Sequence, residues 1–392
     1  MSDKNLSRPP AAVDAQRRID LDWVRIAAFG LLIFYHVGML YVSWDFHVKS
    51  EHRITALEPV MIALNPWRLA LLFVVSGAVT RFMLGKYTVG RFMAARTWRL
   101  LVPLLFGMLV VVPPQAYDQV VESVRYGGSF LHFYLSDYFA FGPRFCNPGP
   151  CILLPTWNHL WFVAYLFVYT LVLGAVLAAW PGLHERIGSD AFPKLSGAVV
   201  LLAPALLCAM WRLWLLPRFP STHALAGDWY NHALFGTMFL SGFAVARAEG
   251  VWTEIERLRW WALGCAVPLY ALVLTLRFAG QPLPAPLGIA AGLAYGFYQW
   301  FAIVAVLGFA GRWLNRDSPA RRYLTDAIFP YYIVHQTAII AIAHHLKGWQ
   351  LPAWVEAGLV ISGTAAACAA TYEIVRRIAP LRPLFGLRRN AA

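Results

Sequence analysis

The sequence is poor in charged residues. Asp, Glu, Lys and Arg make up only 14% of its 392 residues, whereas about a quarter of an average soluble domain is charged. Apolar residues make up 59%, so the few polar groups are not enough to cover a water-exposed surface. Low charge and high hydropathy together exclude a disordered chain, a coiled coil and a cytosolic enzyme. The composition predicts a polytopic membrane protein.

Cysteine is also scarce, and the short motifs of many enzymes are missing. Five cysteines are too few and too scattered for a disulfide framework or a metal cluster, and His223 and His232 have only Asp228 near ligand spacing. We therefore expect no metal. The chain has no Gly-x-Ser-x-Gly motif, no dinucleotide-binding fingerprint and no phosphate-binding Gly-rich loop. Any enzymatic chemistry must then depend on His and Arg side chains within the membrane.

A concentrated basic patch is missing as well, despite a net charge of +13. The 33 Lys and Arg residues occur in short blocks between apolar runs, which is the pattern of membrane topology and not of a nucleic-acid partner. The first 22 residues have no apolar core, so they predict a disordered N-terminal tail (1–22) and no cleavable signal peptide.

Long apolar runs, by contrast, are abundant. About 20 apolar residues cross the hydrocarbon as a helix, because backbone polar groups must be paired within the segment. Ten segments fit this requirement: 23–43, 60–84, 100–116, 158–180, 196–216, 231–247, 260–278, 287–310, 326–346 and 353–375. We predict an all-α fold with a ten-helix membrane domain over 23–375, in which span 100–116 ends at Pro113-Pro114. Residues 117–157 form its one long connection, and 376–392 form a basic tail.

The basic residues set the orientation of this bundle. With the N-terminus inside the cell, only nine of the 33 basic residues lie outside or in outward halves of spans: Lys49, Arg53, Arg68, Arg125, Arg144, Arg212, Arg218, Arg277 and Lys347. The positive-inside rule then predicts that both termini are cytoplasmic and that the connection 117–157 is periplasmic. Cys146 and Cys151 lie outside on this topology, where disulfides persist, and we favour a disulfide between them.

The first predicted span carries ionisable residues at a helical spacing. Arg25 and His36 are eleven positions apart, which is three turns plus about 20°, so both project from one face, roughly 16 Å apart along the axis. Asp22 lies on the same face, in position to pair with Arg25. Ionisable groups inside a membrane are costly, which makes this stripe a candidate functional site. The alternative is that Arg25 reaches the headgroups and His36 bonds a neighbouring helix.

Other polar side chains also occur in or beside the predicted spans. Arg68 stands two turns into the second span, where it needs an anion or backbone carbonyls as partners. Arg96 and Arg99 share a helix face; they can grip adjacent phosphates or simply anchor the basic side of the membrane. Histidines and an aromatic residue at the outer interface or in the ninth span complete the candidate set: His47, His159, Trp161 and His335.

Taken in order along the chain, these motifs resemble those of the membrane-bound acyltransferase-3 family. The resemblance rests on Arg25-x10-His36, Arg68-x4-Phe73-Val-Val-Ser76-Gly77, Arg96-x-x-Arg99-x3-Pro103, His159-Leu-Trp161-Phe162 and Tyr332-x-x-His335-Gln336. The His47-Val48 stretch resembles the branch that succinylates osmoregulated periplasmic glucans. The chain departs from the family pattern in its Cys146/Cys151 loop, which leaves the acceptor open.

The resemblance implies transfer of an acyl group, succinyl or acetyl, from cytoplasmic acyl-CoA to a hydroxyl of a periplasmic glycan. In this reading Arg96, Arg99 and Arg25 bind the CoA donor. His36 takes the proton from the attacking hydroxyl, and His335 supports His36 or donates to the oxyanion. The substrate contacts come from Arg68, His47, His159 and Trp161.

The resemblance also implies a multi-pass protein of a bacterial inner membrane. Its partners are then membrane lipid, acyl-CoA and the glycan acceptor, with association into a homo-oligomer left open. An alternative from another class is a transporter of sugars or organic anions, and a third is a non-catalytic flippase partner. Transport predicts accumulation of unmodified solute, whereas acyl transfer predicts free CoA and a heavier acceptor.

Overall fold

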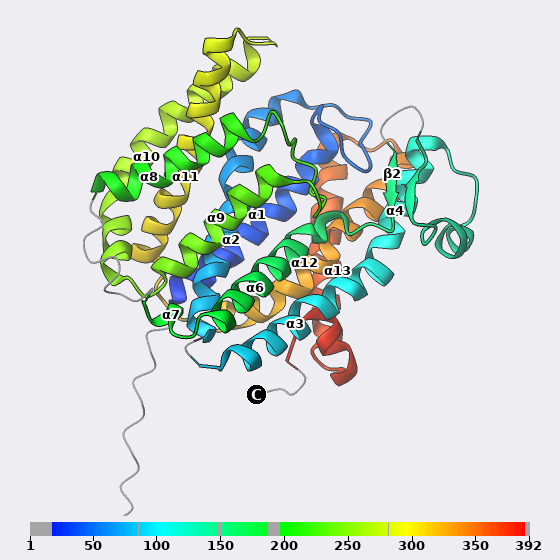
Figure 1. Cartoon of the computed structure of the whole chain (residues 1–392). Helices are drawn as coiled ribbons and strands as arrows, with labels where there is room; N and C mark the ends of the chain where they lie inside the picture. The colour runs from blue at the N-terminus through cyan, green and yellow to red at the C-terminus, as the bar shows by residue number, and fades with distance from the viewer. Residues whose placement is uncertain (1–17, 85, 147–150, 187–196, 281, 389–392) are drawn as a thin grey trace, which may run out of the picture.

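The computed structural model describes residues 18–84, 86–146, 151–186, 197–280 and 282–388 and is almost entirely helical (Figure 1). This confirms the predicted all-α fold. The long helices are α1 (Ile19–Tyr41), α2 (Glu58–Leu84), α3 (Val89–Phe106), α4 (Val112–Val124), α6 (Trp161–Ala179), α8 (Gly197–Trp214), α9 (Trp229–Val245), α10 (Glu249–Phe278), α11 (Ala285–Trp313), α12 (Pro319–Leu346) and α13 (Ala353–Val375). Short helices are α5 (Phe130–His132) and α7 (Leu183–Arg186), and one hairpin pairs β1 (Gly142–Arg144) with β2 (Ile152–Leu154).

Both described ends of the chain lie at the same end of the bundle. Asp22 at the start of α1 pairs with Arg321 at the start of α12. Tyr323, also at the start of α12, donates to Glu373 at the end of α13 (2.9 Å). We call this end, at the bottom of Figure 1, the terminal end, and the other the opposite end.

The number of crossings follows from this placement. In the described residues, nine helical segments are long and apolar enough to cross a membrane. The remaining one of the ten predicted spans is α9, which has only 17 residues. A chain that starts and finishes at the same end crosses an even number of times, so α9 is the tenth crossing.

The third crossing corrects the predicted span 100–116. The helix does not stop at Pro113-Pro114 but continues from Val89 to Val124, through a wide π-helical turn at Gly107–Val111. Proline lacks the N–H that a preceding carbonyl needs, and the wide turn leaves such carbonyls to other donors. Hydroxyl groups supply them: Tyr138 donates to Met108 O (2.7 Å), Tyr134 to Leu109 O (3.0 Å) and Thr337 to Val111 O (2.8 Å).

The connection after α4 is more ordered than the predicted loop 117–157. It contains α5, a second π-helical turn (Phe133–Asp137) and the β1–β2 hairpin, packed around the buried side chains of Phe133 and Tyr138. The predicted disulfide between Cys146 and Cys151 is present. The Pro-Gly stretch between these cysteines lies outside the described residues.

Smaller boundary differences occur at both ends of the chain. Helix α1 begins at Ile19, four residues before the predicted first span, and residues 1–17 of the predicted tail lie outside the described residues. Part of the predicted basic tail folds into a tight helical segment, η7 (Ala379–Phe385), which turns back onto α3: the rings of Phe106 and Phe385 are 5.2 Å apart.

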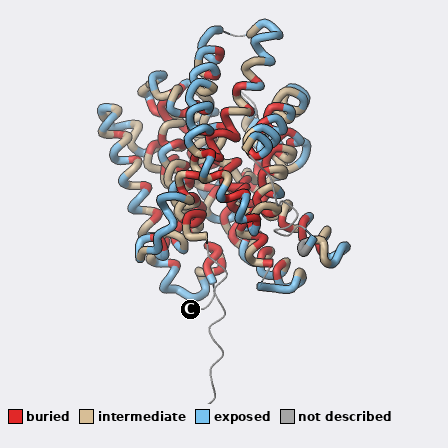
Figure 2. The backbone as a smooth tube through the Cα atoms, turned by 90° about the vertical axis from the view of Figure 1, so that its left-hand side faces the viewer, coloured by how far each residue is buried: buried red, intermediate tan, exposed pale blue. Residues whose placement is uncertain are grey.

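The buried residues gather in the middle of the bundle (Figure 2). The outward faces of α8, α10 and α13 carry exposed apolar side chains. This is the distribution expected where lipid replaces water as the solvent. Helices α2 and α9 pack closely against each other at two glycines, one on each helix. A methyl group added to Gly77 would lie 1.9 Å from the carbonyl oxygen of Phe239, and one added to Gly242 would lie 1.9 Å from that of Val74.

Candidate active site

A pair of imidazole rings joins α1 to α12 inside the bundle. His36 Nδ1 lies 3.0 Å from His335 Nε2, and the two rings are nearly parallel with centroids 5.1 Å apart. His335 is buried, whereas His36 is half-buried. The two residues that the sequence analysis singled out as catalytic are thus in direct contact, although 299 positions separate them.

The hydrogen bonds of His335 determine which nitrogen of His36 carries a lone pair. His335 Nδ1 lies 2.7 Å from the carbonyl oxygen of Tyr332, which only accepts, so Nδ1 of His335 bears the proton. In the neutral ring Nε2 of His335 is then an acceptor, and Nδ1–H of His36 donates to it. The lone pair of His36 therefore sits on Nε2, where a neutral imidazole acts as a base.

His159 is the third ring of this cluster. It lies in the short helical turn η4 (Asn158–Leu160) and meets His335 edge to face, with centroids 5.0 Å apart. Its Nε2–H donates to the carbonyl oxygens of Tyr332 (3.1 Å) and Ile333 (3.0 Å), and the Tyr332 hydroxyl donates back to the His159 carbonyl. These bonds fix the backbone segment that orients His335. The substrate contact predicted for His159 stays a prediction.

Arg68 is buried beside the histidines, only 2% exposed. Its guanidinium lies over the ring of Tyr35 at 3.6 Å, and Nε and Nη1 have no hydrogen-bond partner among the described residues. The side chain is within electrostatic range of His36 and His335. A buried guanidinium with unpaired N–H groups is costly, so this position favours an anionic or carbonyl-bearing ligand.

His47 and Trp161 have partners outside the imidazole pair. His47 follows α1 at the opposite end and donates through Nδ1 to Gln119 Oε1 (2.7 Å), with Phe46 between His47 and His36. Burial lowers the pKa of His47, and the bond to Gln119 partly offsets this. Trp161 stacks on His223 at 4.2 Å. The substrate contacts predicted for Arg68, His47 and Trp161 stay predictions.

A cavity of about 1000 Å³ opens at the opposite end, between α2, α8, α9, α10 and α11. Its walls combine aromatic rings, amides and a guanidinium: Trp44, Asn65, Arg212, Tyr230, Asn231 and Tyr295. Arg212 lies over the Tyr295 ring at 3.4 Å. His223, on which Trp161 stacks, is also part of the wall, and the lining residues Pro66 and Leu69 flank Arg68 along α2.

Buried polar residues fix one wall of this cavity. Asp228, with no exposed surface, accepts from the Tyr165 hydroxyl (2.5 Å), from the Asn231 amide (2.8 Å) and from the backbone N–H of His223 (3.0 Å). The sequence analysis considered Asp228 only as a weak metal ligand. Its Asp-x-x-Asn spacing at the start of α9 was the available signal.

The terminal end carries a cluster of arginines from α1 and α3. Arg96 is buried, donates to Thr80 Oγ1 (3.3 Å) and lies within electrostatic range of Arg25 and Arg99. Arg25 lies 4.0 Å from Asp22, as the spacing predicted. The three arginines predicted to bind the donor are therefore brought together at one end of the bundle.

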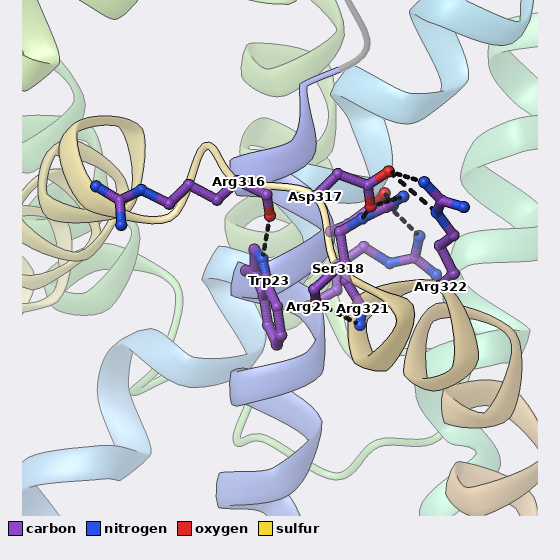
Figure 3. A network of polar contacts seen from close by, with 8 residues as sticks. Trp23, Arg25, Arg316, Asp317, Ser318, Arg321 and Arg322 are labelled. Carbon is purple, nitrogen blue, oxygen red and sulfur yellow. Dashed lines mark hydrogen bonds and ion pairs between the residues drawn. The ribbon is translucent and has the colours of Figure 1, made fainter.

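Asp22 also has a stronger partner, which sequence reasoning missed. Arg321, only 3% exposed, donates to Asp22 and to Asp317 (2.8 Å). Figure 3 shows Arg321 with Asp317 and Arg322, beside Arg25. Arg322 and Arg321 hold the pKa of Asp317 well below its usual range. In the sequence Arg321 resembles any loop arginine of the basic side, so only the fold reveals its burial.

Gln115 is a second missed residue. It is fully buried, donates to Thr337 Oγ1 (2.9 Å) and accepts from the amide of Gln336 (3.0 Å), beside His335 on α12. The prediction that the span ended at the proline pair placed Gln115 near water, which removed the reason to examine it.

The fold and this arrangement define a class: a helical membrane protein with a bonded imidazole pair inside the bundle and an arginine cluster at one end. The sequence profile of the acyltransferase domain family, acyltransferase-3, matches residues 18–373. The chain therefore belongs to this family of membrane acyltransferases.

Curated relatives agree with the family over the full length. Glucans biosynthesis protein C of Escherichia coli K12 is 23% identical over 401 aligned residues, which cover 95% of both chains. The proteins of the same name from strains O9:H4 and SE11 show the same identity and coverage. No solved structure matches the chain significantly.

Proposed function

We propose that this protein transfers an acyl group from acyl-CoA to a hydroxyl of a glycan, with Nε2 of His36 as the general base. The observation that carries the proposal is the hydrogen-bonded series from His36 through His335 to the Tyr332 carbonyl, which leaves the lone pair of His36 on Nε2. A base held in one tautomer is ready to accept a proton without rearrangement.

The chemistry balances with these residues. The hydroxyl oxygen attacks the thioester carbonyl carbon while Nε2 of His36 takes the hydroxyl proton. The C–S bond then breaks, and the protonated Nε2 returns the proton to the departing CoA sulfur. The products are an ester and free CoA. During the reaction His36 carries a positive charge, which its Nδ1–H bond to His335 stabilises.

The donor fits the arginine cluster at the terminal end. CoA carries several phosphate charges, and Arg25, Arg96 and Arg99 gather positive charge there. The positive-inside rule makes this end cytoplasmic, in a bacterial inner membrane, where acyl-CoA is available. Between the two acyl groups left open by the sequence, the buried Arg68 favours succinyl, because a carboxylate satisfies its unpaired N–H groups.

The acceptor fits the cavity at the opposite end. Aromatic faces and amide groups suit the apolar ring faces and the hydroxyls of sugars, and His223 and Trp161 extend the same wall. The names of the curated relatives refer to glucan biosynthesis, which supports a periplasmic glucan as the acceptor.

The test is release of CoA by the purified protein in liposomes, from succinyl-CoA and from acetyl-CoA, with and without a linear β-glucan. We expect release that depends on the glucan, an increase in glucan mass, and loss of both in His36→Ala. Release that is independent of the glucan and survives in His36→Ala contradicts the proposal. Uptake of unmodified sugar or organic anion without CoA release favours a transporter instead.

A further inference from the structure

A second cavity, of about 460 Å³, lies at the terminal end where η7 folds back beside α12 and α13. Its walls are mainly cationic and aromatic: Arg322, Tyr323, Asp326, Tyr372, Arg376 and Arg382. None of these residues belongs to the Arg25, Arg96 and Arg99 cluster, and the cavity has no role in the chemistry described above.

The three arginines of this cavity differ in how their charges are balanced. Arg322 donates to Asp317 (2.6 Å), and Arg376 donates to Glu373 (3.3 Å). Arg382 donates to the backbone carbonyl oxygens of Arg388 (2.6 Å) and Arg376 (3.2 Å), and forms no ion pair with a carboxylate of the described chain. Arg382 is therefore held in place by carbonyl groups and not by an ion pair, which favours an anionic ligand.

The aromatic wall favours a ligand with a planar ring. Tyr323 and Tyr372 meet edge to face with centroids 5.0 Å apart, and the Arg376 guanidinium lies within 6 Å of both rings, at 5.8 and 5.6 Å. Aromatic and guanidinium planes stack on nucleobases, and Arg binds phosphate in a forked geometry. A phosphorylated nucleoside satisfies both features.

The cavity lies next to the arginine cluster of α1 and α3. Arg99 is within electrostatic range of Asp326, which lines the cavity, and of Arg388, which follows η7. The carbonyl of Arg99 lies beside Gly386, which packs against Phe329 of α12. Positive charge therefore extends from Arg25 to Arg382 across this end.

We propose that this cavity binds the 3′-phosphorylated adenosine of the acyl-CoA donor, with Arg382 on the 3′-phosphate and the tyrosine wall beside the adenine. The diphosphate then lies toward Arg25, Arg96 and Arg99. This inference rests on the acyl-CoA donor of the proposed function and adds to it: the enzyme distinguishes CoA from thioesters that lack the 3′-phosphate.

The test compares acyl-CoA with acyl-dephospho-CoA, which lacks only the 3′-phosphate, in the wild type and in Arg382→Gln. In the wild type we expect the KM for acyl-dephospho-CoA to be about 10- to 100-fold higher, since a charge-assisted phosphate contact is lost. In Arg382→Gln the KM for acyl-CoA rises to that value, whereas the kinetics with acyl-dephospho-CoA do not change. The unchanged kinetics also show that the variant is folded.

Arg377→Gln is the matched control, because Arg377 is a neighbouring exposed arginine that pairs with Glu373 at 2.9 Å and does not line the cavity. We expect Arg377→Gln to keep the wild-type ratio of the two KM values, for acyl-dephospho-CoA and acyl-CoA. Equal KM values for the two donors in the wild type, or a ratio that Arg382→Gln leaves intact, overturn the proposal.

A separate binding assay distinguishes failure of the proposed function from failure of the nucleotide site. If the wild type releases CoA from neither donor, direct binding of 3′,5′-adenosine bisphosphate to the detergent-solubilised protein still tests the cavity. Binding that is weakened about tenfold or more in Arg382→Gln, but not in Arg377→Gln, supports the nucleotide site without acyl transfer. Absence of binding to the wild type refutes it.

Discussion

Replacing His335 by Leu removes the acceptor that fixes the tautomer of His36. In the structure Nδ1–H of His36 donates to His335 Nε2 at 3.0 Å, and this bond becomes charge-assisted when His36 takes a proton. A hydrogen bond to a charged group contributes about 1.5–3 kcal/mol, so kcat falls about 10- to 150-fold in His335→Leu. The KM values change little, because in the proposed mechanism His335 positions His36 and does not touch the substrate.

The assay is CoA release under saturating donor and acceptor, with three companion variants. His335→Gln keeps a side-chain acceptor and loses less activity than His335→Leu. In His36→Ala we expect kcat to fall by about 10²- to 10⁴-fold, which is the usual contribution of a general base. The double variant is no slower than His36→Ala alone, because His335 acts through His36.

His345→Leu is the control for a changed histidine on the same helix, since His345 is exposed and bonds only within α12 in the described structure (His345 Nδ1 to Ala341 O, 2.7 Å). It retains wild-type rates. A loss in His335→Leu that adds to the loss in His36→Ala refutes the reasoning, since it shows that His335 works independently. A higher KM with unchanged kcat refutes it as well.

Two other substitutions test the acyl site and the helix packing. Arg68→Gln removes the buried guanidinium beside Tyr35, so the ratio of kcat/KM for succinyl-CoA over acetyl-CoA falls about tenfold or more; an unchanged ratio ends the carboxylate role of Arg68. Gly77→Ala places a methyl group 1.9 Å from the Phe239 carbonyl oxygen and destabilises the α2–α9 contact by about 1–3 kcal/mol or more. Its thermal unfolding temperature in detergent drops, whereas Gly264→Ala, where a methyl group meets nothing within 4 Å, does not lower it.

The bundle could be predicted because the bilayer imposes one rule on every span: an apolar run long enough to pair its own backbone. The rule failed where backbone pairing was supplied from elsewhere. Pro113 and Pro114 read as the end of a span, yet hydroxyl groups of Tyr134, Tyr138 and Thr337 satisfy the carbonyls that the wide turn leaves, so the helix continues. The local sequence around the prolines does not reveal hydrogen-bond donors that come from other segments of the chain.

Only the part of the candidate active site that lies on one helix, α1, could be predicted from the sequence. The spacing of Arg25 and His36 on α1 requires only helical geometry, and the pairing of Arg25 with Asp22 follows from the same spacing. The bond from His36 to His335 depends on the rotation and depth of α12 against α1, which hydropathy leaves undetermined. For the same reason the burial of Arg321 and Gln115 became visible only in the fold.

In the proposed function, the two ends of α1 correspond to reactants on opposite sides of a membrane. Positive charge gathers where α1 begins, at Arg25, and the proposed base His36 lies about 16 Å further along the same helix. Half of a bilayer's hydrocarbon is about 15 Å thick, so a donor held by its phosphates at the terminal end must extend a narrow arm along α1 to place its thioester at His36. The cavity proposed for the acceptor opens at the opposite end, so in this mechanism only the acyl group has to cross. Such a mechanism requires that the nucleotide binds firmly at the terminal end, as proposed for the Arg382 cavity. The charged phosphates of the donor then remain at that end while the acyl group reaches His36.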